Sequence, residues 1–300
     1  MRSAIPERQY LKDVASVLLA TLLWSLSGVF VRLISTHDGW QINAYRGIST
    51  SAALLIFLFA VYGRDTSNRF RAIEWRAFVL SAGFFALGST LYVVALSLTS
   101  VANVSCIAAT APIFSAVLAR IFANERTGLL AWAATAMAIG GVYFILRDSL
   151  GGVGQAGDLV AIAVAFCFAS QTVVLRKYRS VDMVPAICVG GVAVFALVAL
   201  FIGLSELPAR DLALIAAMGV IQLAAPLVLF IRGARTVPAI QLSLIALLDV
   251  VFNPLWAYIG VGEVPDRNAF IGGAIIVSAV GITVLGRAWA RTTAQNSDGK

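Results

Sequence analysis

The chain has 300 residues, of which 60% are hydrophobic and only 12% are charged, and its mean hydropathy is +0.91. A water-soluble domain of this size needs far more surface charge, so the composition excludes that class and predicts an integral membrane protein. The formal net charge of +7 comes from basic residues spread over many short loops. These residues form no continuous stripe for nucleic acid, and they are typical of orientation signals that face anionic lipid.

Ten apolar stretches follow one another along the chain, each close to the 20 or so residues that cross the hydrocarbon core of a bilayer. No polar segment long enough for a soluble domain separates them, so the sequence predicts an all-α protein with ten transmembrane helices. We predict these spans at residues 13–35, 42–62, 75–97, 101–121, 127–146, 158–177, 184–204, 211–232, 237–258 and 267–286.

The loops between these spans are alternately rich and poor in basic residues. Of the 22 Lys and Arg residues, 17 belong to one side: Arg2, Arg8, Lys12, Arg64, Arg69, Arg71, Arg76, Arg120, Arg126, Arg176, Lys177, Arg179, Arg232, Arg235, Arg287, Arg291 and Lys300. The other five belong to or lie near the opposite side: Arg32, Arg46, Arg147, Arg210 and Arg267. Basic loops stay in the cytoplasm, so we predict that both termini are cytoplasmic and that the membrane is the inner membrane of a bacterium.

The two halves of the sequence resemble each other. Residues 13–35 and 158–180 share the pairs Asp13/Asp158, Ala20/Ala165, Ser25/Ser170, Val29/Val174 and Ser35/Ser180. Residues 111–125 and 249–263 share Phe114/Phe252, Ala119/Ala257, Ile121/Ile259 and Glu125/Glu263. We therefore expect a short cytoplasmic segment (1–12), a five-helix repeat (13–147), a second such repeat (158–287) and a cytoplasmic tail (288–300). Because five is odd, the second repeat would be inverted in the membrane, an arrangement that can move a midplane site between two openings.

One stretch in the fourth span carries a family resemblance. The segment PIFSAVLARIFANER, from Pro112 to Arg126, followed by Gly-Gly-Val-Tyr at 140–143, resembles the signature of the drug/metabolite transporter superfamily, and more narrowly of the EamA type of exporter. Arg46, at the start of the second span, is also similar to that family's pattern.

The resemblance covers residues 13–287. It implies two inverted five-helix repeats around a central cavity, which helices one to four and six to nine would line. Relatives of this type export aromatic and other amino acids, drugs or other metabolites. The second half departs from the pattern, because Asp249-Val250 stands where the first half has Ala111-Pro112.

Two charged residues lie deep inside predicted spans, where a charge is costly and usually functional. Asp249, near the middle of the ninth span, could bind a substrate ammonium or carry a proton that couples transport; it could also lie near an interface or bond a neighbouring backbone. Arg46 could bind a substrate carboxylate. It could instead anchor the end of its helix by snorkelling outward or by holding carbonyls of the first span.

Uncharged side chains at the same depth complete the candidate site. Amides offer a donor and an acceptor, and flat rings can form a cavity wall, although each could also serve only helix packing. The candidate substrate-binding residues are Trp24, Ser27, Asn43, Phe84, Tyr92, Asn103, Gln171, Gln222, Gln241 and Asn253. Pro112 and Pro254 interrupt helical hydrogen bonding in spans four and nine and are candidate hinges.

These features predict a secondary-active or facilitative exporter of aromatic and other apolar amino acids and related metabolites. The alternatives are a multidrug or nucleotide-sugar carrier of the same fold and, in another class, a membrane sensor or enzyme. The chain has no nucleotide-binding Gly-x-x-x-x-Gly-Lys-Ser/Thr loop and one histidine, His37, so we expect no catalytic residues, cofactor or metal. Its expected partners are a small-molecule substrate and the lipid bilayer, without nucleic acid, and the protein would be a monomer or a homodimer.

Overall fold

The computed structural model describes residues 7–147, 155–261 and 267–298, and every regular element in these residues is helical. In chain order the elements are α1 (Glu7–Trp24), α2 (Ser27–Leu33), α3 (Gly39–Tyr62), η1 (Gly63–Asp65), α4 (Thr66–Arg71), α5 (Trp75–Leu98), α6 (Val101–Ala108), α7 (Ala111–Phe122), α8 (Leu129–Leu146), α9 (Gln155–Lys177), α10 (Val184–Phe201), α11 (Ala209–Ala217), η3 (Met218–Ala224), α12 (Ala225–Gly233), α13 (Ala239–Ala246), α14 (Leu248–Val261) and α15 (Arg267–Asp298). Glu263 and the N-terminal residues 1–6 lie outside the described residues.

Eight helical segments in the described part of the chain are long and apolar enough to cross a membrane. Two shorter apolar helices, 239–253 and 270–286, lie in the ninth and tenth predicted spans. Large apolar side chains also cover the outside of the bundle: Leu129 is 86% exposed and Phe201 78% exposed. Lipid removes the cost of exposing these side chains to water. The prediction of an all-α, multi-pass membrane protein is confirmed.

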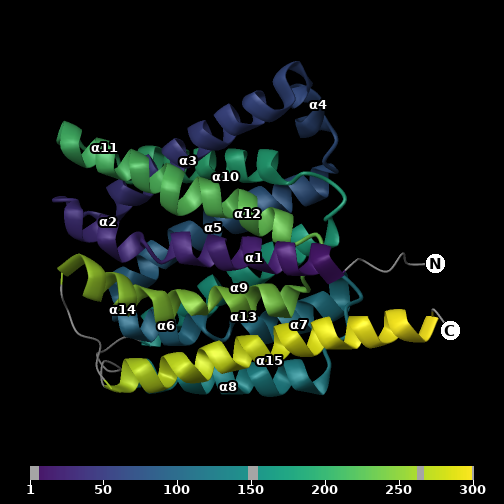
Figure 1. The fold of residues 1–300 in the computed structure, drawn as a ribbon. Helices are drawn as coiled ribbons and strands as arrows, with labels where there is room; N and C mark the ends of the chain where they lie inside the picture. Colours follow the sequence, from purple (N-terminus) through teal and green to yellow (C-terminus); the bar gives the residue numbers. More distant parts are fainter. Residues whose placement is uncertain (1–6, 148–154, 262–266, 299–300) are drawn as a thin grey trace.

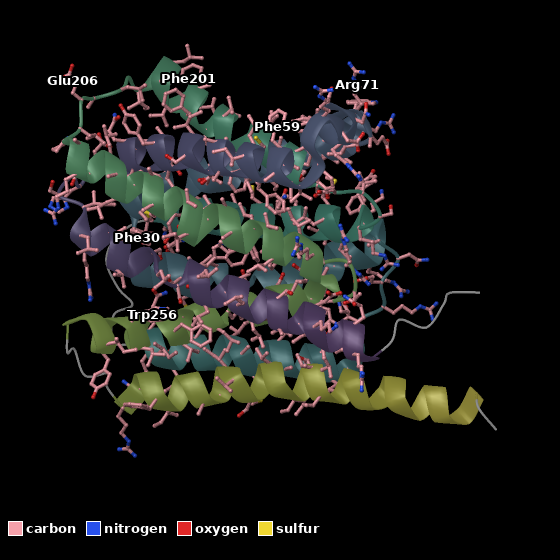
Figure 2. The ribbon with its side chains drawn as sticks, turned by 45° about the horizontal axis from the view of Figure 1, so that its top comes forward. Phe30, Phe59, Arg71, Phe201, Glu206 and Trp256 are labelled. Atoms are coloured by element: carbon pink, nitrogen blue, oxygen red, sulfur yellow. The ribbon has the colours of Figure 1, made fainter. Side chains whose placement is uncertain are left out.

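The long helices run roughly along one direction, and the chain's two ends lie on the same side of the bundle (Figure 1). We call this side, which also carries α4, the α4 end. The opposite side, which carries α2 and the start of α11, is the α2 end. Arg71 and Glu206 mark the two ends (Figure 2).

Helices from the two halves of the chain pack against one another in matched combinations. The main contacts join α3 with α10, α8 with α15, α5 with α9, and α1 with α12. Small residues allow these close approaches. A Cβ atom on Gly191 would lie 2.6 Å from the Gly47 carbonyl oxygen, and one on Gly272 would lie 2.5 Å from that of Gly141. Glycine at these positions therefore sets the spacing of two helix pairs between the halves.

Two side-chain hydrogen bonds between the halves also correspond to each other. Thr236, after α12, donates to Asp13 on α1 at 2.6 Å. Thr99, after α5, donates to Asp158 on α9 at 3.2 Å. Each half thus places a carboxylate in its first helix against a threonine that follows the third predicted span of the other half.

Several predicted spans are not continuous α-helices. The first is divided between α1 and α2 at Ser25 and Leu26, and the fourth between α6 and α7 at Ala109 and Thr110. The eighth contains the π-helical turn η3. π-turns and broken helices free backbone polar groups at membrane depth, and they are frequent at functional sites.

The prolines relate to these breaks in different ways. Pro112 lies in the first turn of α7, where a backbone N–H has no helical hydrogen-bond partner, so a proline there loses no hydrogen bond. It therefore marks the start of α7. The interruption of the ninth span falls at Leu247, between α13 and α14, and α14 continues through residue 254. Pro254 lies within α14, seven residues after this interruption, and it stays a candidate hinge.

Candidate functional site

A polar cluster joins α3 and α5 inside the bundle. The Arg46 guanidinium donates through Nη2 to Asn43 Oδ1 at 3.1 Å and to Ser89 Oγ at 3.4 Å. Ser89 Oγ donates to the same Asn43 oxygen at 2.7 Å, and Asn43 Nδ2 donates to the Ser89 carbonyl at 3.4 Å. Asn43 is fully buried, so it holds Arg46 and Ser89 in a fixed relation. The predicted bonds from Arg46 to carbonyls of the first span are not formed.

Arg46 is only partly satisfied by this cluster. Its Nε is buried from solvent and has no hydrogen-bond partner. The Asp249 carboxylate is in the same condition, because its Oδ1 is buried without a partner, in the first turn of α14. A buried polar group without a partner costs about 1–3 kcal/mol, and more when it is charged. These two groups are thus the strongest candidates for contact with a ligand.

Tyr92 links the two charged groups. It lies within electrostatic reach of both Arg46 and Asp249, and its side chain is 37% exposed. Arg46 and Asp249 form no ion pair with each other in the described residues. Both charged groups therefore act on the same phenol without pairing with each other.

Two buried glutamines each offer one free atom. Gln171 Nε2 on α9 donates to Ser81 Oγ at 2.9 Å, and Gln222 Nε2 in η3 donates to the Trp24 carbonyl at 3.1 Å. The Oε1 atoms of both glutamines are buried and have no partner, as is Thr90 Oγ1. Each amide is thus oriented by one bond and keeps an acceptor available.

The break between α1 and α2 packs against α14. Trp256 Nε1 donates to Ser25 Oγ at 2.7 Å, and Asn253 Nδ2 donates to the Asp249 carbonyl at 3.0 Å. Ser27 begins α2 and is half-buried. Sequence reasoning missed Trp256. Its signal is the spacing Asp249, Asn253, Trp256, which places the three residues on one helix face.

Aromatic rings form two groups near these residues. Trp24 packs on Phe230 and Phe168, with ring centroids 5.0 and 6.4 Å apart. Phe84 and Phe114 each contact Phe166 edge to face, at 6.4 and 5.9 Å. Trp24 and Phe84 were predicted, whereas the phenylalanines of α9 and α12 were not, because single phenylalanines in apolar helices carry no distinctive pattern.

Two predicted residues lie elsewhere. Gln241 is buried in α13, where Tyr10 Oη donates to its Oε1 at 3.0 Å and its Nε2 donates to the Thr283 carbonyl at 2.7 Å. Asn103 Nδ2, in the first turn of α6, donates to Thr99 Oγ1 at 3.0 Å. Both bond neighbouring elements rather than the Arg46 cluster.

A second charged cluster lies at the α4 end, and the sequence analysis did not identify it as a site. Arg176, only 5% exposed, pairs through Nε with Glu125 and donates through Nη1 to the carbonyls of Ala234 and Arg235 at 2.9 and 2.6 Å. The other Glu125 oxygen accepts from the Ala239 backbone at 3.2 Å. This pair joins the end of α7, the end of α9 and the start of α13.

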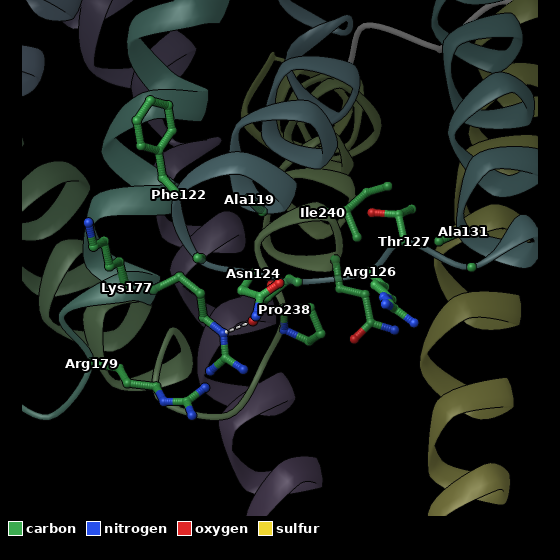
Figure 3. Close-up of a pocket in the computed structure, with 15 residues that line it drawn as sticks. Ala119, Phe122, Asn124, Arg126, Thr127, Ala131, Lys177, Arg179, Pro238 and Ile240 are labelled. Atoms are coloured by element: carbon green, nitrogen blue, oxygen red, sulfur yellow. Dashed lines mark hydrogen bonds and ion pairs between the residues drawn. The ribbon is translucent and has the colours of Figure 1, made fainter.

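A cavity of about 680 Å³ borders the Glu125–Arg176 pair (Figure 3). Lys177 and Arg179 lie on one side of it, and Arg126, Thr127 and Ile240 lie on the other. In the described residues, no group of His, Cys, Asp and Glu side chains has the arrangement of a metal site.

Buried, unpaired charges beside broken helices, within a bundle that crosses the membrane many times, define a membrane transporter. The chain belongs to the EamA-like transporter family, which matches residues 12–147 and again residues 155–285. This finding confirms the resemblance deduced from the sequence.

Curated relatives have transporter names rather than enzyme names. The S-adenosylmethionine uptake transporters of Rickettsia felis and Rickettsia prowazekii are 22% and 21% identical to this chain, over 91% of it and 92% of each relative. The transporter of the same name from Rickettsia bellii is 22% identical over 91% of this chain and 93% of its own length. A crystal structure of another protein, 20% identical, matches with a TM-score of 0.80 over 91% of this chain and 96% of that one, which shows a shared fold.

Proposed function

We propose that this transporter carries small zwitterions with an α-amino-acid group, aromatic and apolar amino acids first, across the inner membrane of a bacterium. The observation that carries the proposal is the pair of buried, unpartnered atoms, Arg46 Nε and Asp249 Oδ1, whose side chains both lie within electrostatic reach of Tyr92. Arg46 would bind the carboxylate of the substrate and Asp249 its ammonium. A zwitterion would then supply both missing partners.

The substrate side chain would lie against aromatic residues. Trp24, with Phe168 and Phe230 behind it, offers a flat apolar surface next to Gln222. Such a surface favours aromatic or aliphatic groups over highly charged ones. S-adenosylmethionine, named for the Rickettsia relatives, also carries an α-amino-acid group and is the second candidate. Export is our first expectation, and the names of those relatives support uptake.

Alternating access between two inverted five-helix repeats, 13–147 and 158–287, would move the substrate. Three observations support these repeats: the family matches the chain twice, the α5–α9 and α1–α12 contacts correspond under exchange of the halves, and the Asp13–Thr236 and Asp158–Thr99 bonds correspond in the same way. At the α2 end, no residue of helix α2 is buried. Toward the α4 end, residues 171–176 of α9 are all buried. The conformation described here would therefore be closed at the α4 end, which we assign to the cytoplasm.

Counterflow in proteoliposomes tests the substrate assignment with phenylalanine, phenyllactate, which lacks the ammonium, and phenethylamine, which lacks the carboxylate. We expect Arg46→Gln to abolish the advantage of phenylalanine over phenethylamine, and Asp249→Asn its advantage over phenyllactate. Arg210→Gln and Asp65→Asn, exposed positions with the same charge changes, are the controls. Preference for a nucleotide sugar or an organic cation drug, unaffected by either variant, would contradict the proposal.

An imposed pH gradient separates the secondary-active from the facilitative mechanism. If Asp249 also carries a coupled proton, Asp249→Asn should make transport insensitive to the gradient. Unchanged pH dependence in this variant would exclude Asp249 from coupling and leave its assignment to the substrate ammonium intact.

A further inference from the structure

A groove between α7 and α8 opens toward the outside of the bundle at the α4 end. Its volume is about 520 Å³, and its walls are Ala116, Val117, Arg120, Ile121, Arg126, Thr127 and Trp132. The two helices barely touch each other, because α7 packs on α9 and α13 while α8 packs on α15. The groove thus lies between α7 and α8 because each of them packs against different helices.

The groove combines two kinds of surface that a phospholipid also combines. Arg120 and Arg126 are exposed, and neither makes a hydrogen bond or an ion pair with any described residue. Next to them, Val117 is 47% exposed and Ile121 65% exposed along α7. Two free guanidinium groups therefore stand at the end of a continuous apolar strip.

Trp132, 38% exposed in the first turn of α8, lies on the other wall. Tryptophan at the end of a membrane helix favours the headgroup region of the bilayer. Its presence places Arg120 and Arg126 at the depth of lipid phosphates, where Arg can bind a phosphate through two N–H groups.

We propose that this groove binds an anionic glycerophospholipid of the adjacent leaflet, with its phosphate on Arg120 and Arg126 and an acyl chain along Val117 and Ile121. Basic pockets between membrane helices are typical sites for anionic headgroups. Arg126 and Thr127 also border the larger cavity beside Glu125 and Arg176 (Figure 3). A bound lipid would therefore contact the segment that connects α7 to α8, directly beside the Glu125–Arg176 pair.

Native mass spectrometry of the purified protein in detergent, titrated with dioleoyl phosphatidylglycerol, measures the binding. We expect the double variant Arg120→Gln/Arg126→Gln to bind about 30-fold more weakly, since each cation near an anionic lipid contributes about 1 kcal/mol. Arg64→Gln/Arg71→Gln, which removes two exposed arginines elsewhere at the α4 end, should bind as the wild type does.

Two further ligands identify what the groove recognises. Dioleoyl phosphatidylcholine should bind at least tenfold more weakly than phosphatidylglycerol, and glycerol 1-phosphate, which lacks acyl chains, should show no binding at the same concentrations. Equal binding of the two lipids, or an unchanged affinity in Arg120→Gln/Arg126→Gln, would overturn the proposal. Binding of glycerol phosphate as tight as that of the lipid would make the groove a site for a soluble phosphate and would equally overturn it.

Discussion

Arg176 and Arg46 have opposite surroundings. Arg176, at the α4 end, is paired with Glu125 and bonded to two backbone carbonyls, and both Glu125 oxygens have partners. Arg46 has a buried Nε without a partner, and Asp249 has a buried Oδ1 without a partner. A complete network holds helices together, whereas an incomplete one keeps capacity for a ligand. The difference separates a structural closure from a candidate substrate site.

The largest expected effect is a loss of stability when the Glu125–Arg176 network is broken. Arg176→Met removes a buried charge and leaves the half-buried Glu125 carboxylate and two carbonyls without their partner, so we expect a loss of about 3 kcal/mol in the free energy of unfolding. Thermal unfolding in detergent, or steric trapping in bicelles, measures it. Arg179→Met, at an exposed position three residues after Arg176, is the control and should change stability little. If Arg176→Met left the free energy of unfolding unchanged, the Glu125–Arg176 pair would not hold this end closed.

Arg46→Met should show the opposite pattern, with a small effect on stability and a large effect on transport. It removes an incompletely bonded charge, so the free energy of unfolding should fall by less than about 1 kcal/mol or rise. Transport of an amino acid should fall about 10- to 100-fold, because a hydrogen bond to a charged group contributes about 1.5–3 kcal/mol. Stability and proteoliposome transport are measured on the same preparation. A variant as unstable as Arg176→Met with normal transport would reverse our assignment of the two clusters.

Glu125→Gln tests whether the complete network controls access. Arg176 keeps its two carbonyl bonds in this variant but loses its ionic partner, so a cost of about 1–3 kcal/mol should fall mainly on the conformation closed at the α4 end. A cysteine at Ile240, which is buried beside the cavity, in a background without Cys106, Cys167 and Cys188, reports the change. The expected result is faster labelling by a membrane-impermeant thiol reagent when Glu125→Gln is present, and an equal rate would contradict it.

The smallest expected effect concerns the break in the first span. Trp256→Phe keeps an aromatic ring but removes the indole N–H that bonds Ser25 Oγ, together with the five-membered part of the indole. We expect a loss of about 0.5–1.5 kcal/mol in stability and a modest increase in substrate KM, because Ser25 adjoins Trp24. Trp132→Phe, an exposed tryptophan on α8, is the matched control. An effect as large as that of Arg46→Met on transport would place Trp256 in direct contact with substrate.

Much of the fold was predictable because lipid imposes simple rules on sequence. Apolar length gave the spans, and the segment from Pro112 to Arg126 gave the family. Asp249 and Arg46 were identified as candidates because a charge within a span is rare and has few structural explanations. The same argument did not extend to Gln241, whose polar atoms are all used within the protein.

Other features depend on contacts between distant segments and leave no local pattern. Glu125 and Arg176 are 51 residues apart, and each alone resembles a basic or acidic residue at the end of a span. The break at Leu247 has no proline or glycine beside it, so helix propensity could not locate it, and the more conspicuous Pro254 lies within α14. Trp256 was discoverable from its spacing to Asp249, but aromatic residues in membrane helices are too common for that spacing to be decisive.

The contact between Gly47 and Gly191 has a mechanical consequence. Where α3 and α10 cross, the Gly47 and Gly191 backbones lie against each other, with the Ser51 and Val194 side chains beside them. The angle between the helices can therefore change here without displacing a side chain at either glycine, while the bond from Ser51 Oγ to the Cys188 carbonyl, at 2.6 Å, holds the helices together. Alanine at either position would add a methyl group against a carbonyl, and it would obstruct tilting between the two helices as well as weaken their association.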